Sequence, residues 1–202
     1  MFVIVRHGNT FAADEKPRRI GARTDLPLTE AGRTQARALG ALFAENGWRF
    51  TRTLVSPLSR TRATAALILE HQAAPPPPEV CDWLSEIDHG PDENQSEEAV
   101  MARIGKEALA AWDERAEAPP GWLVDGDVRK AAWRELFAAP PRTDPTLIVT
   151  SNGAARFALL SDPALATAVS ELPSLKLPTG AYGVIRRGQD RTLEVSVWGQ
   201  RP

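Results

Sequence analysis

Short apolar strands alternate with helix-like segments along this chain, and no other feature limits its fold as strongly. The run Phe2–Val5 is apolar and rich in β-branched residues, as in a strand buried on both faces of a parallel sheet. Similar runs at Thr53–Val55 and Thr146–Val149 are each followed by a helical pattern. The alternation predicts an α/β fold of three layers, α/β/α, with a mostly parallel central sheet.

Two segments depart from strict alternation. From Asp92 to about Ala139 the pattern is helical and acidic, with a break at Pro119-Pro120-Gly121. Near the end of the chain, Tyr182–Ile185 and Leu193–Val197 are typical of two consecutive strands. Because 202 residues suit one domain, we expect a single domain over residues 1–202, with a helical insertion at about 92–139.

Capping residues predict where two of the helices begin. Thr29 is a good N-cap for a helix that carries an apolar stripe, and Gly47 suits its C-terminal end. Ser56 followed by Pro57 is typical of a second helix start. That start places Arg60 in the first turn of the second helix.

The composition excludes several classes of function. A net charge of -2 provides no excess of positive charge for binding a nucleic acid. One cysteine and three histidines cannot build a disulfide framework or a Cys/His zinc site, and no metal or other cofactor is implied. The first apolar run is too short for a signal peptide, and none approaches the roughly 20 residues of a membrane-spanning helix. These features predict a soluble, cytoplasmic protein without a membrane partner.

Polar clusters follow three of the predicted strands directly. They are Arg6-His7-Gly8-Asn9-Thr10, Ser56 to Arg60, and Ser151-Asn152-Gly153. Ligands of parallel α/β sheets bind beyond the carboxyl ends of the strands. Two of the clusters also lead into helix N-termini, whose free N–H groups favour anions. The clusters therefore predict one site for an anion the size of phosphate.

These clusters belong to a longer series of motifs. The series reads Val5-Arg6-His7-Gly8-Asn9-Thr10, Asp25-x-Pro27-Leu28-Thr29-x-x-Gly32, Ser56-Pro57-Leu58-Ser59-Arg60-Thr61, Leu84-Ser85-Glu86 and Val149-Thr150-Ser151-Asn152-Gly153. In these motifs the chain resembles the histidine phosphatase superfamily, which includes the cofactor-dependent phosphoglycerate mutases. The resemblance covers nearly the whole sequence.

The resemblance implies a role for each of four residues. His7 corresponds to the nucleophile, which takes up the phosphoryl group as phosphohistidine. Arg6 and Arg60 correspond to the two arginines that grip the phosphoryl oxygens, a task that suits a guanidinium fork. Glu86 stands where the family carries the acid that protonates the leaving alkoxide.

Other polar residues near these motifs are candidates for substrate contacts. Asn9 and Thr10 lie in the loop around the nucleophile and offer neutral donors. Arg18, Arg19 and Arg23 are candidates to steer a second anionic group of the substrate, and a solvated loop is at least as good an interpretation of them. Each assignment has a structural alternative: a hydrogen-bonded histidine at a strand end, an arginine on a helix surface, or a glutamate on a solvated acidic face that continues into Asp92-Glu93.

The chain departs from the family in two places. The family's second phosphate-binding histidine is replaced by Asn152, whose amide can donate a hydrogen bond but cannot carry a charge. His89, three residues after Glu86, is the better placed substitute, since His71 lies on the order of 15 Å along a helix from Arg60. The mutases' Trp-Asn pair after the nucleophile loop is also missing, because Phe11-Ala12 stand there.

The sequence thus favours a phosphatase over a mutase. The first hypothesis is hydrolysis of a small-molecule phosphomonoester through His7, and the second is a catalytically impaired member that binds a phosphorylated ligand or partner. A nucleotide-binding α/β protein is disfavoured, because no Gly-rich phosphate loop follows a strand. Substrate specificity is expected from the 92–139 insertion and the Phe11–Arg23 loop. The C-terminal strands offer an edge for pairing, but the oligomeric state is left open.

Overall fold

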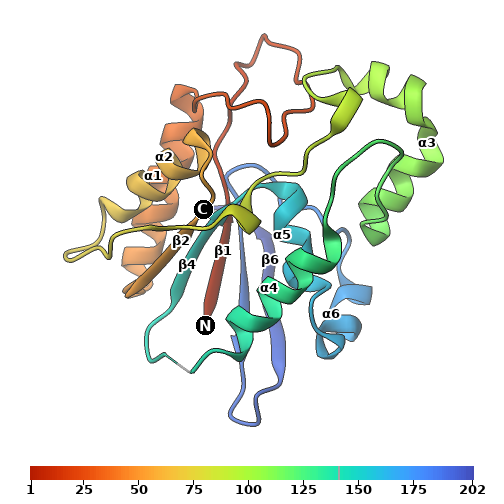
Figure 1. The fold of residues 1–202 in the computed structure, drawn as a ribbon. Coiled ribbons are helices and arrows are strands. Elements are labelled where there is room, and N and C mark those ends of the chain that lie inside the picture. The colour runs from red at the N-terminus through yellow and green to blue at the C-terminus, as the bar shows by residue number, and fades with distance from the viewer. Residues whose placement is uncertain (141) are drawn as a thin grey trace.

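A computed structural model describes residues 1–140 and 142–202 and contains a six-stranded sheet (Figure 1). The strands are β1 (Phe2–Arg6), β2 (Arg52–Val55), β3 (Glu79–Val80), β4 (Thr146–Thr150), β5 (Tyr182–Arg187) and β6 (Leu193–Gln200), in the order β3-β2-β4-β1-β5-β6. The four strands β3, β2, β4 and β1 pair in parallel, and β5 and β6 add an antiparallel hairpin beside β1. This confirms the predicted α/β class and its mostly parallel sheet.

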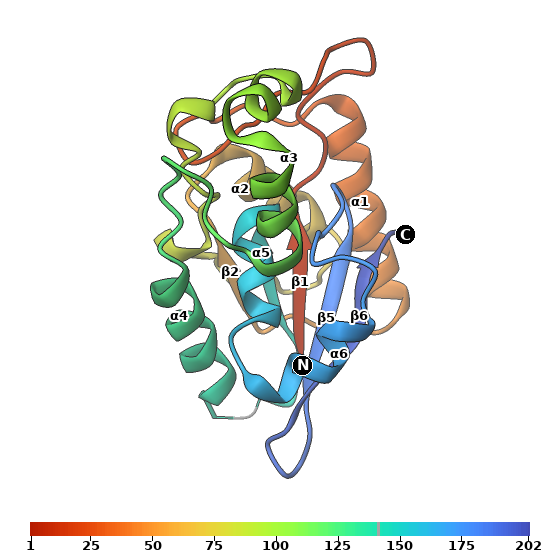
Figure 2. The same cartoon turned by 90° about the vertical axis from the view of Figure 1, so that its right-hand side faces the viewer.

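Helices cover both faces of the sheet. On one side lie α1 (Glu30–Glu45) and α2 (Ser59–Leu69), and on the other α4 (Gly126–Ala138), α5 (Asn152–Leu159) and α6 (Ala166–Glu171) (Figures 1 and 2). Short 3₁₀ turns span Asp82–Leu84, Gly90–Asp92 and Pro163–Leu165. The predicted three layers are therefore present.

Strand β1 is the centre of both hydrophobic cores. Its successive side chains point to opposite faces. Phe2 and Ile4 pack with Trp133 of α4 and its neighbours, whereas Val3 and Val5 pack with Phe43 of α1 and its neighbours. Burial of each such side chain stabilises the fold by about 1.5–3 kcal/mol relative to an exposed position. The double burial explains why the Phe2–Val5 run has no polar residue.

The acidic segment after residue 92 forms two helices that lie in different places. Helix α3 (Glu97–Arg115) lies beyond the end of the sheet at which β1 finishes, whereas α4 packs directly on the sheet (Figures 1 and 2). Within α3, Gly105 leaves the helical conformation at φ 81°, so the helix is broken there. Of this segment, α3 and its flanking turns therefore extend over the end of the sheet, and α4 does not.

The capping predictions had different outcomes. Thr29 is the N-cap of α1 as expected, since its hydroxyl accepts from the Gly32 N–H, and Gly47 has a left-handed φ of 70° after the helix. The prediction that Ser56 caps the next helix was wrong, because Leu58 is still extended and α2 begins at Ser59. Among the described residues, no helix is both long enough and apolar enough to cross a membrane.

Candidate active site

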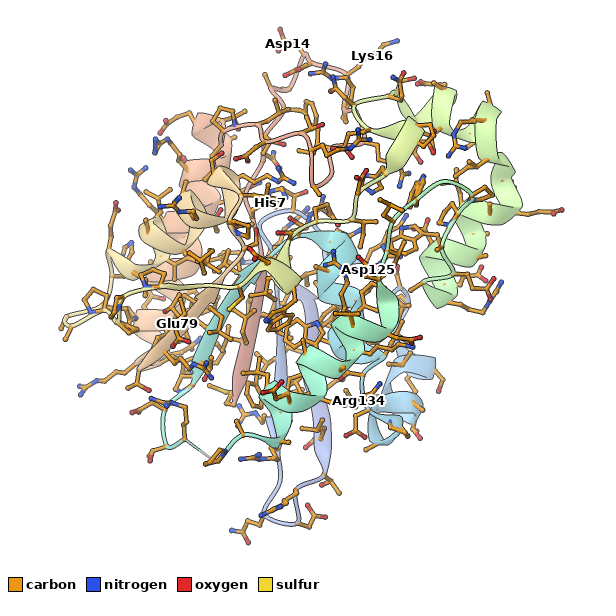
Figure 3. All side chains as sticks on the ribbon, viewed as in Figure 1. His7, Asp14, Lys16, Glu79, Asp125 and Arg134 are labelled. Carbon is orange, nitrogen blue, oxygen red and sulfur yellow. The ribbon has the colours of Figure 1, made fainter. Side chains whose placement is uncertain are left out.

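His7 follows β1 at the end of the sheet where the parallel strands finish. Its N–H donates to the Thr150 carbonyl at 3.1 Å, and its own carbonyl accepts from the Gly180 N–H at 3.1 Å. The backbone is thus held between the end of β4 and the loop that enters β5. The side chain is 4% exposed, and the loop with Asp14 and Lys16 lies above it, farther from the sheet (Figure 3).

The hydrogen bonds of the His7 ring define its tautomer. Nδ1 lies 2.8 Å from the Gly8 carbonyl oxygen, and because a carbonyl can only accept, Nδ1 carries the proton. Nε2 then carries the lone pair of the ring, which accepts from Nε of Arg60 at 3.3 Å. Burial, together with the cations Arg6 and Arg60, lowers the pKa of His7 well below its usual value. The imidazole is therefore neutral at physiological pH, the state that a nucleophile requires.

Arg60 is fully buried in the first turn of α2. Besides the contact with His7, its Nη1 donates to the Thr24 carbonyl at 2.8 Å and its Nη2 to the Gly21 carbonyl at 3.1 Å. Asp25, which also accepts from the Ser59 N–H, lies 3.5 Å from Nη1. These contacts hold the guanidinium in one orientation beside the imidazole.

The backbone of one residue in the loop before β5, Leu177, anchors two further side chains. The Leu177 carbonyl accepts from Nη1 of Arg6 at 3.0 Å, and the Leu177 N–H donates to Oδ1 of Asn152 at 2.9 Å. Nε of Arg6 is buried without a partner. Because the Asn152 oxygen accepts from Leu177, the amide presents its NH2 group on the other side. Arg6 and Asn152 thus keep donors available for an anion.

Glu86 is 7% exposed and receives two backbone hydrogen bonds. They come from the Ile87 N–H at 2.8 Å and from the Gly153 N–H, in the first turn of α5, at 3.2 Å. Burial alone would raise the pKa of Glu86, but His89, the two N–H groups and Arg60 together lower it. A Cβ at position 153 would lie 2.1 Å from Oε1 of Glu86. Glycine is thus required there for the carboxylate to reach the helix.

His89 is buried and belongs to the same site. Its ring stacks edge-on against Trp122 at 4.5 Å between centroids, and its Nδ1 lies 3.7 Å from Oε2 of Glu93. Burial raises the pKa of Glu93, but hydrogen bonds from His89, Thr24 and Gly21 prevail and lower it to about 2. Since Glu93 is ionised, it supplies a counter-charge for His89 whenever the imidazole is protonated.

A cavity of about 760 Å³ joins these groups. The residues predicted from sequence that line it are Arg6, His7, Asn9, Thr10, Arg18, Arg19, Glu86, His89 and Asn152. Arg60, predicted to grip the phosphoryl oxygens, is fully buried and is not in the lining, but its Nε contacts Nε2 of His7. Arg23 is not in the lining, because its guanidinium is exposed and donates to Asp88 at 3.0 Å and to the Gly90 carbonyl at 2.6 Å. His71 is likewise exposed and outside the cavity.

Several contributors had no clear signal in the sequence. Leu177 acts through its backbone, so its side chain type gives no indication of the role. Asp92 and Glu93 were weighed as part of a solvated face, but Asp92 is 1% exposed and accepts from Trp122 Nε1 at 2.7 Å. Trp112 is buried and also lines the cavity. The residues that the structure describes contain no cluster of histidine, cysteine or carboxylate side chains suited to a metal ion.

Comparison with known proteins gives a consistent result. Residues 2–200 match the family model described as histidine phosphatase superfamily (branch 1). A 2,3-bisphosphoglycerate-dependent phosphoglycerate mutase of Methylobacterium sp. (strain 4-46) is 31% identical over 96% of this chain and 94% of its own length. A protein of the same name from Bacteroides fragilis is 28% identical over 69% of this chain, which spans only 56% of that relative.

Solved structures share the fold over the whole chain. A mycobacterial glucosyl-3-phosphoglycerate phosphatase superposes with a TM-score of 0.75 at 21% identity, covering 100% of this chain and 99% of the other. An alpha-ribazole phosphatase from Shigella flexneri superposes with a TM-score of 0.69 at 22% identity, covering 99% of this chain and 96% of the other. At these identities the similarity concerns the arrangement of the strands and helices.

Proposed function

Because this chain belongs to the histidine phosphatase superfamily, whose members transfer phosphoryl groups through a histidine, we propose that it hydrolyses phosphomonoesters through a phosphohistidine at His7. The observation that carries the proposal is the state of the His7 ring. It is buried and neutral, its Nδ1–H donates to the Gly8 carbonyl, and its Nε2 lies 3.3 Å from Nε of the Arg60 guanidinium.

In the first step, Nε2 of His7 attacks phosphorus in line with the ester oxygen. The N–P bond forms as the P–O bond to the leaving group breaks, and the ring becomes a cation. The Gly8 carbonyl, 2.8 Å from Nδ1, stabilises that positive charge. Arg6, Arg60 and the Asn152 amide bind the equatorial oxygens, where negative charge is spread.

Glu86 transfers the protons in both steps. Its carboxylic acid protonates the departing alkoxide, and the resulting carboxylate then takes a proton from the water that attacks phosphorus. The N–P bond breaks, inorganic phosphate leaves and neutral His7 is restored. In the absence of substrate the pKa of Glu86 is lowered, but a phosphoryl dianion in contact with the carboxylate favours its protonated form. Substrate binding therefore favours protonation of Glu86.

Asn9, Thr10 and His89 complete the proposed set of substrate contacts. All three line the cavity. Asn9 and Thr10 provide neutral hydrogen-bonding groups, and His89, with Glu93 beside it, provides a group that can be cationic. We assign Asn152 to the position of the family's second histidine, since it begins α5 directly after β4 and its amide faces the anion site.

The alternative function is binding of a phosphorylated ligand without turnover, and Asn152 is the observation that favours it. By analogy with losing one oxyanion donor, replacing a charged group there costs about 10²–10³ in rate. A binder of this kind would retain Arg6 and Arg60 but lack sufficient stabilisation of the transition state.

Hydrolysis of p-nitrophenyl phosphate separates the two functions. The phosphatase releases p-nitrophenol and forms an acid-labile phosphoprotein, and His7→Ala abolishes both signals. His71→Ala is the matched control, because His71 is exposed and outside the cavity. No hydrolysis above background, together with thermal stabilisation by vanadate, would refute the phosphatase and support the binder.

A further inference from the structure

The wall of the cavity away from His7 carries ionic side chains that are already paired. We call Phe11, Glu15, Arg18, Arg19 and Glu97 the outer wall, and all five line the cavity. Nη2 of Arg18 lies 3.2 Å from Glu15, and Nη2 of Arg19 lies 2.5 Å from Glu97. Each arginine on this wall therefore has its own carboxylate.

Aromatic rings further restrain the two guanidinium groups. Arg18 lies over the Phe11 ring at 5.7 Å, and Arg19 lies over Trp122 at 5.0 Å. The side chain of Arg19 is only 17% exposed. A negative group of the substrate would have to displace the glutamate from an arginine that also contacts an aromatic ring. The displaced carboxylate would remain close to the bound negative group and repel it.

The other charges of the lining do not compensate. Of the described residues that line the cavity, the arginines are Arg6, Arg18 and Arg19, and Arg6 belongs to the phosphoryl end. Glu30 adds a further carboxylate to the lining. Away from the phosphoryl end, both arginines of the described lining are thus paired with Glu15 and Glu97, and the exposed Glu30 lies 4.0 Å from Nη1 of Arg37. This wall therefore offers no unpaired guanidinium to a second negative group.

We propose that the substrate is a phosphomonoester whose leaving group is uncharged or cationic and carries no second phosphate or carboxylate. This inference rests on the proposed phosphatase function and specifies its substrate class. The volume of about 760 Å³ accommodates a leaving group much larger than glycerol. Phe11 and Trp112 offer apolar contacts for it, and the glutamates offer acceptors for hydroxyl or ammonium groups.

Three small phosphomonoesters of similar size test the proposal. They are 3-phosphoglycerate, glycerol 3-phosphate and O-phosphoethanolamine, which end in a carboxylate, a hydroxyl and an ammonium group. Low ionic strength, near 0.01 M, keeps the Debye length at about 30 Å. We expect kcat/KM for the hydroxyl and ammonium esters to exceed that for 3-phosphoglycerate by about tenfold, which corresponds to 1.4 kcal/mol. A preference for 3-phosphoglycerate overturns the proposal.

Releasing Arg19 from its glutamate should reverse part of this preference. We expect Glu97→Gln to raise kcat/KM for 3-phosphoglycerate about fivefold relative to that for glycerol 3-phosphate. Glu114→Gln is the control, because Glu114 pairs with Arg115 at 3.2 Å outside the cavity. An unchanged ratio in Glu97→Gln also overturns the proposal. Hydrolysis of p-nitrophenyl phosphate is measured in parallel, since its absence refutes the phosphatase function itself.

Discussion

Replacing Asn152 with histidine should raise the turnover of phosphomonoesters. Oδ1 of Asn152 accepts from the Leu177 N–H at 2.9 Å, and Asn152 lines the cavity, so its amide nitrogen is the group left to bind an anion. In a histidine side chain, Nδ1 is bonded to Cγ as Oδ1 is in asparagine, so it can accept the same hydrogen bond. The proton on Nε2 is then directed into the cavity. When a second proton binds Nδ1, the ring carries a positive charge and gives up the hydrogen bond from Leu177, because both ring nitrogens are then donors.

The size of the gain follows from the type of hydrogen bond. A hydrogen bond to a charged group contributes about 1.5–3 kcal/mol, against about 0.5–1.5 kcal/mol for a neutral one. The exchange therefore adds about 1–1.5 kcal/mol of transition-state stabilisation, which is about a five- to tenfold increase in kcat. The existing amide donor keeps this gain well below the full effect of adding a donor where none exists.

Steady-state hydrolysis of glycerol 3-phosphate by Asn152→His, Asn152→Asp and the unmodified protein measures the effect. Asn152→Asp retains an acceptor for Leu177 but replaces the donor with negative charge, so we expect kcat to fall by about 10²-fold or more. If Asn152→His has unchanged or lower kcat while its thermal midpoint is preserved, Asn152 does not occupy the position of a phosphoryl-binding group. The reasoning from the Leu177 anchor would then be wrong.

Three further predictions concern the acid, the pH dependence of stability and a buried ion pair. In Gly153→Ala the added methyl group, 2.1 Å from Oε1 of Glu86, displaces the carboxylate. The kcat should fall by about 10²-fold for glycerol 3-phosphate but far less for p-nitrophenyl phosphate, because the leaving group of the latter needs no proton. Equal losses for both esters contradict the role of Glu86. The pKa values of His7, Glu86 and Glu93 are lowered, that of Glu93 to about 2, so the unfolded chain takes up protons at a higher pH than the folded one. Urea unfolding should therefore show full stability above about pH 6.5, a first decrease as His7 titrates in the unfolded chain, and a steeper decrease below about pH 4.5. A free energy of unfolding that is constant from pH 8 to 4 refutes these shifts. Arg103→Met removes the ion pair of Asp92, which is 1% exposed, and leaves its carboxylate the hydrogen bond from Trp122; the free energy of unfolding should fall by about 1–3 kcal/mol. Arg115→Met removes an exposed pair with Glu117 and should change the free energy of unfolding by no more than about 0.5 kcal/mol. Similar losses of stability in both variants exclude a special role for the buried pair.

Local patterns in the sequence were sufficient to predict the strands and the end of the sheet at which the site lies. Phe2–Val5 is buried on both faces, and a strand in that environment has no position for a polar residue. The polar clusters after β1, β2 and β4 meet because these strands are parallel and finish at one end of the sheet. The Ser56 prediction failed for a local reason as well, since its hydroxyl bonds Thr61 at 2.8 Å and the chain stays extended up to Leu58.

The sequence by itself determined the α/β class, the positions of β1, β2 and β4 and the presence of His7, Arg6, Glu86 and Asn152 near one another. Only the tertiary structure decided which atoms of these residues remain available. The contact of the His7 ring with Arg60 joins residues 53 positions apart, the orientation of the Asn152 amide depends on Leu177, 25 residues away, and the pairing of Arg19 depends on Glu97, 78 residues away. Such contacts join backbone groups or charges that carry no local pattern, because hydrogen bonds and ion pairs depend on separation in space and not along the chain.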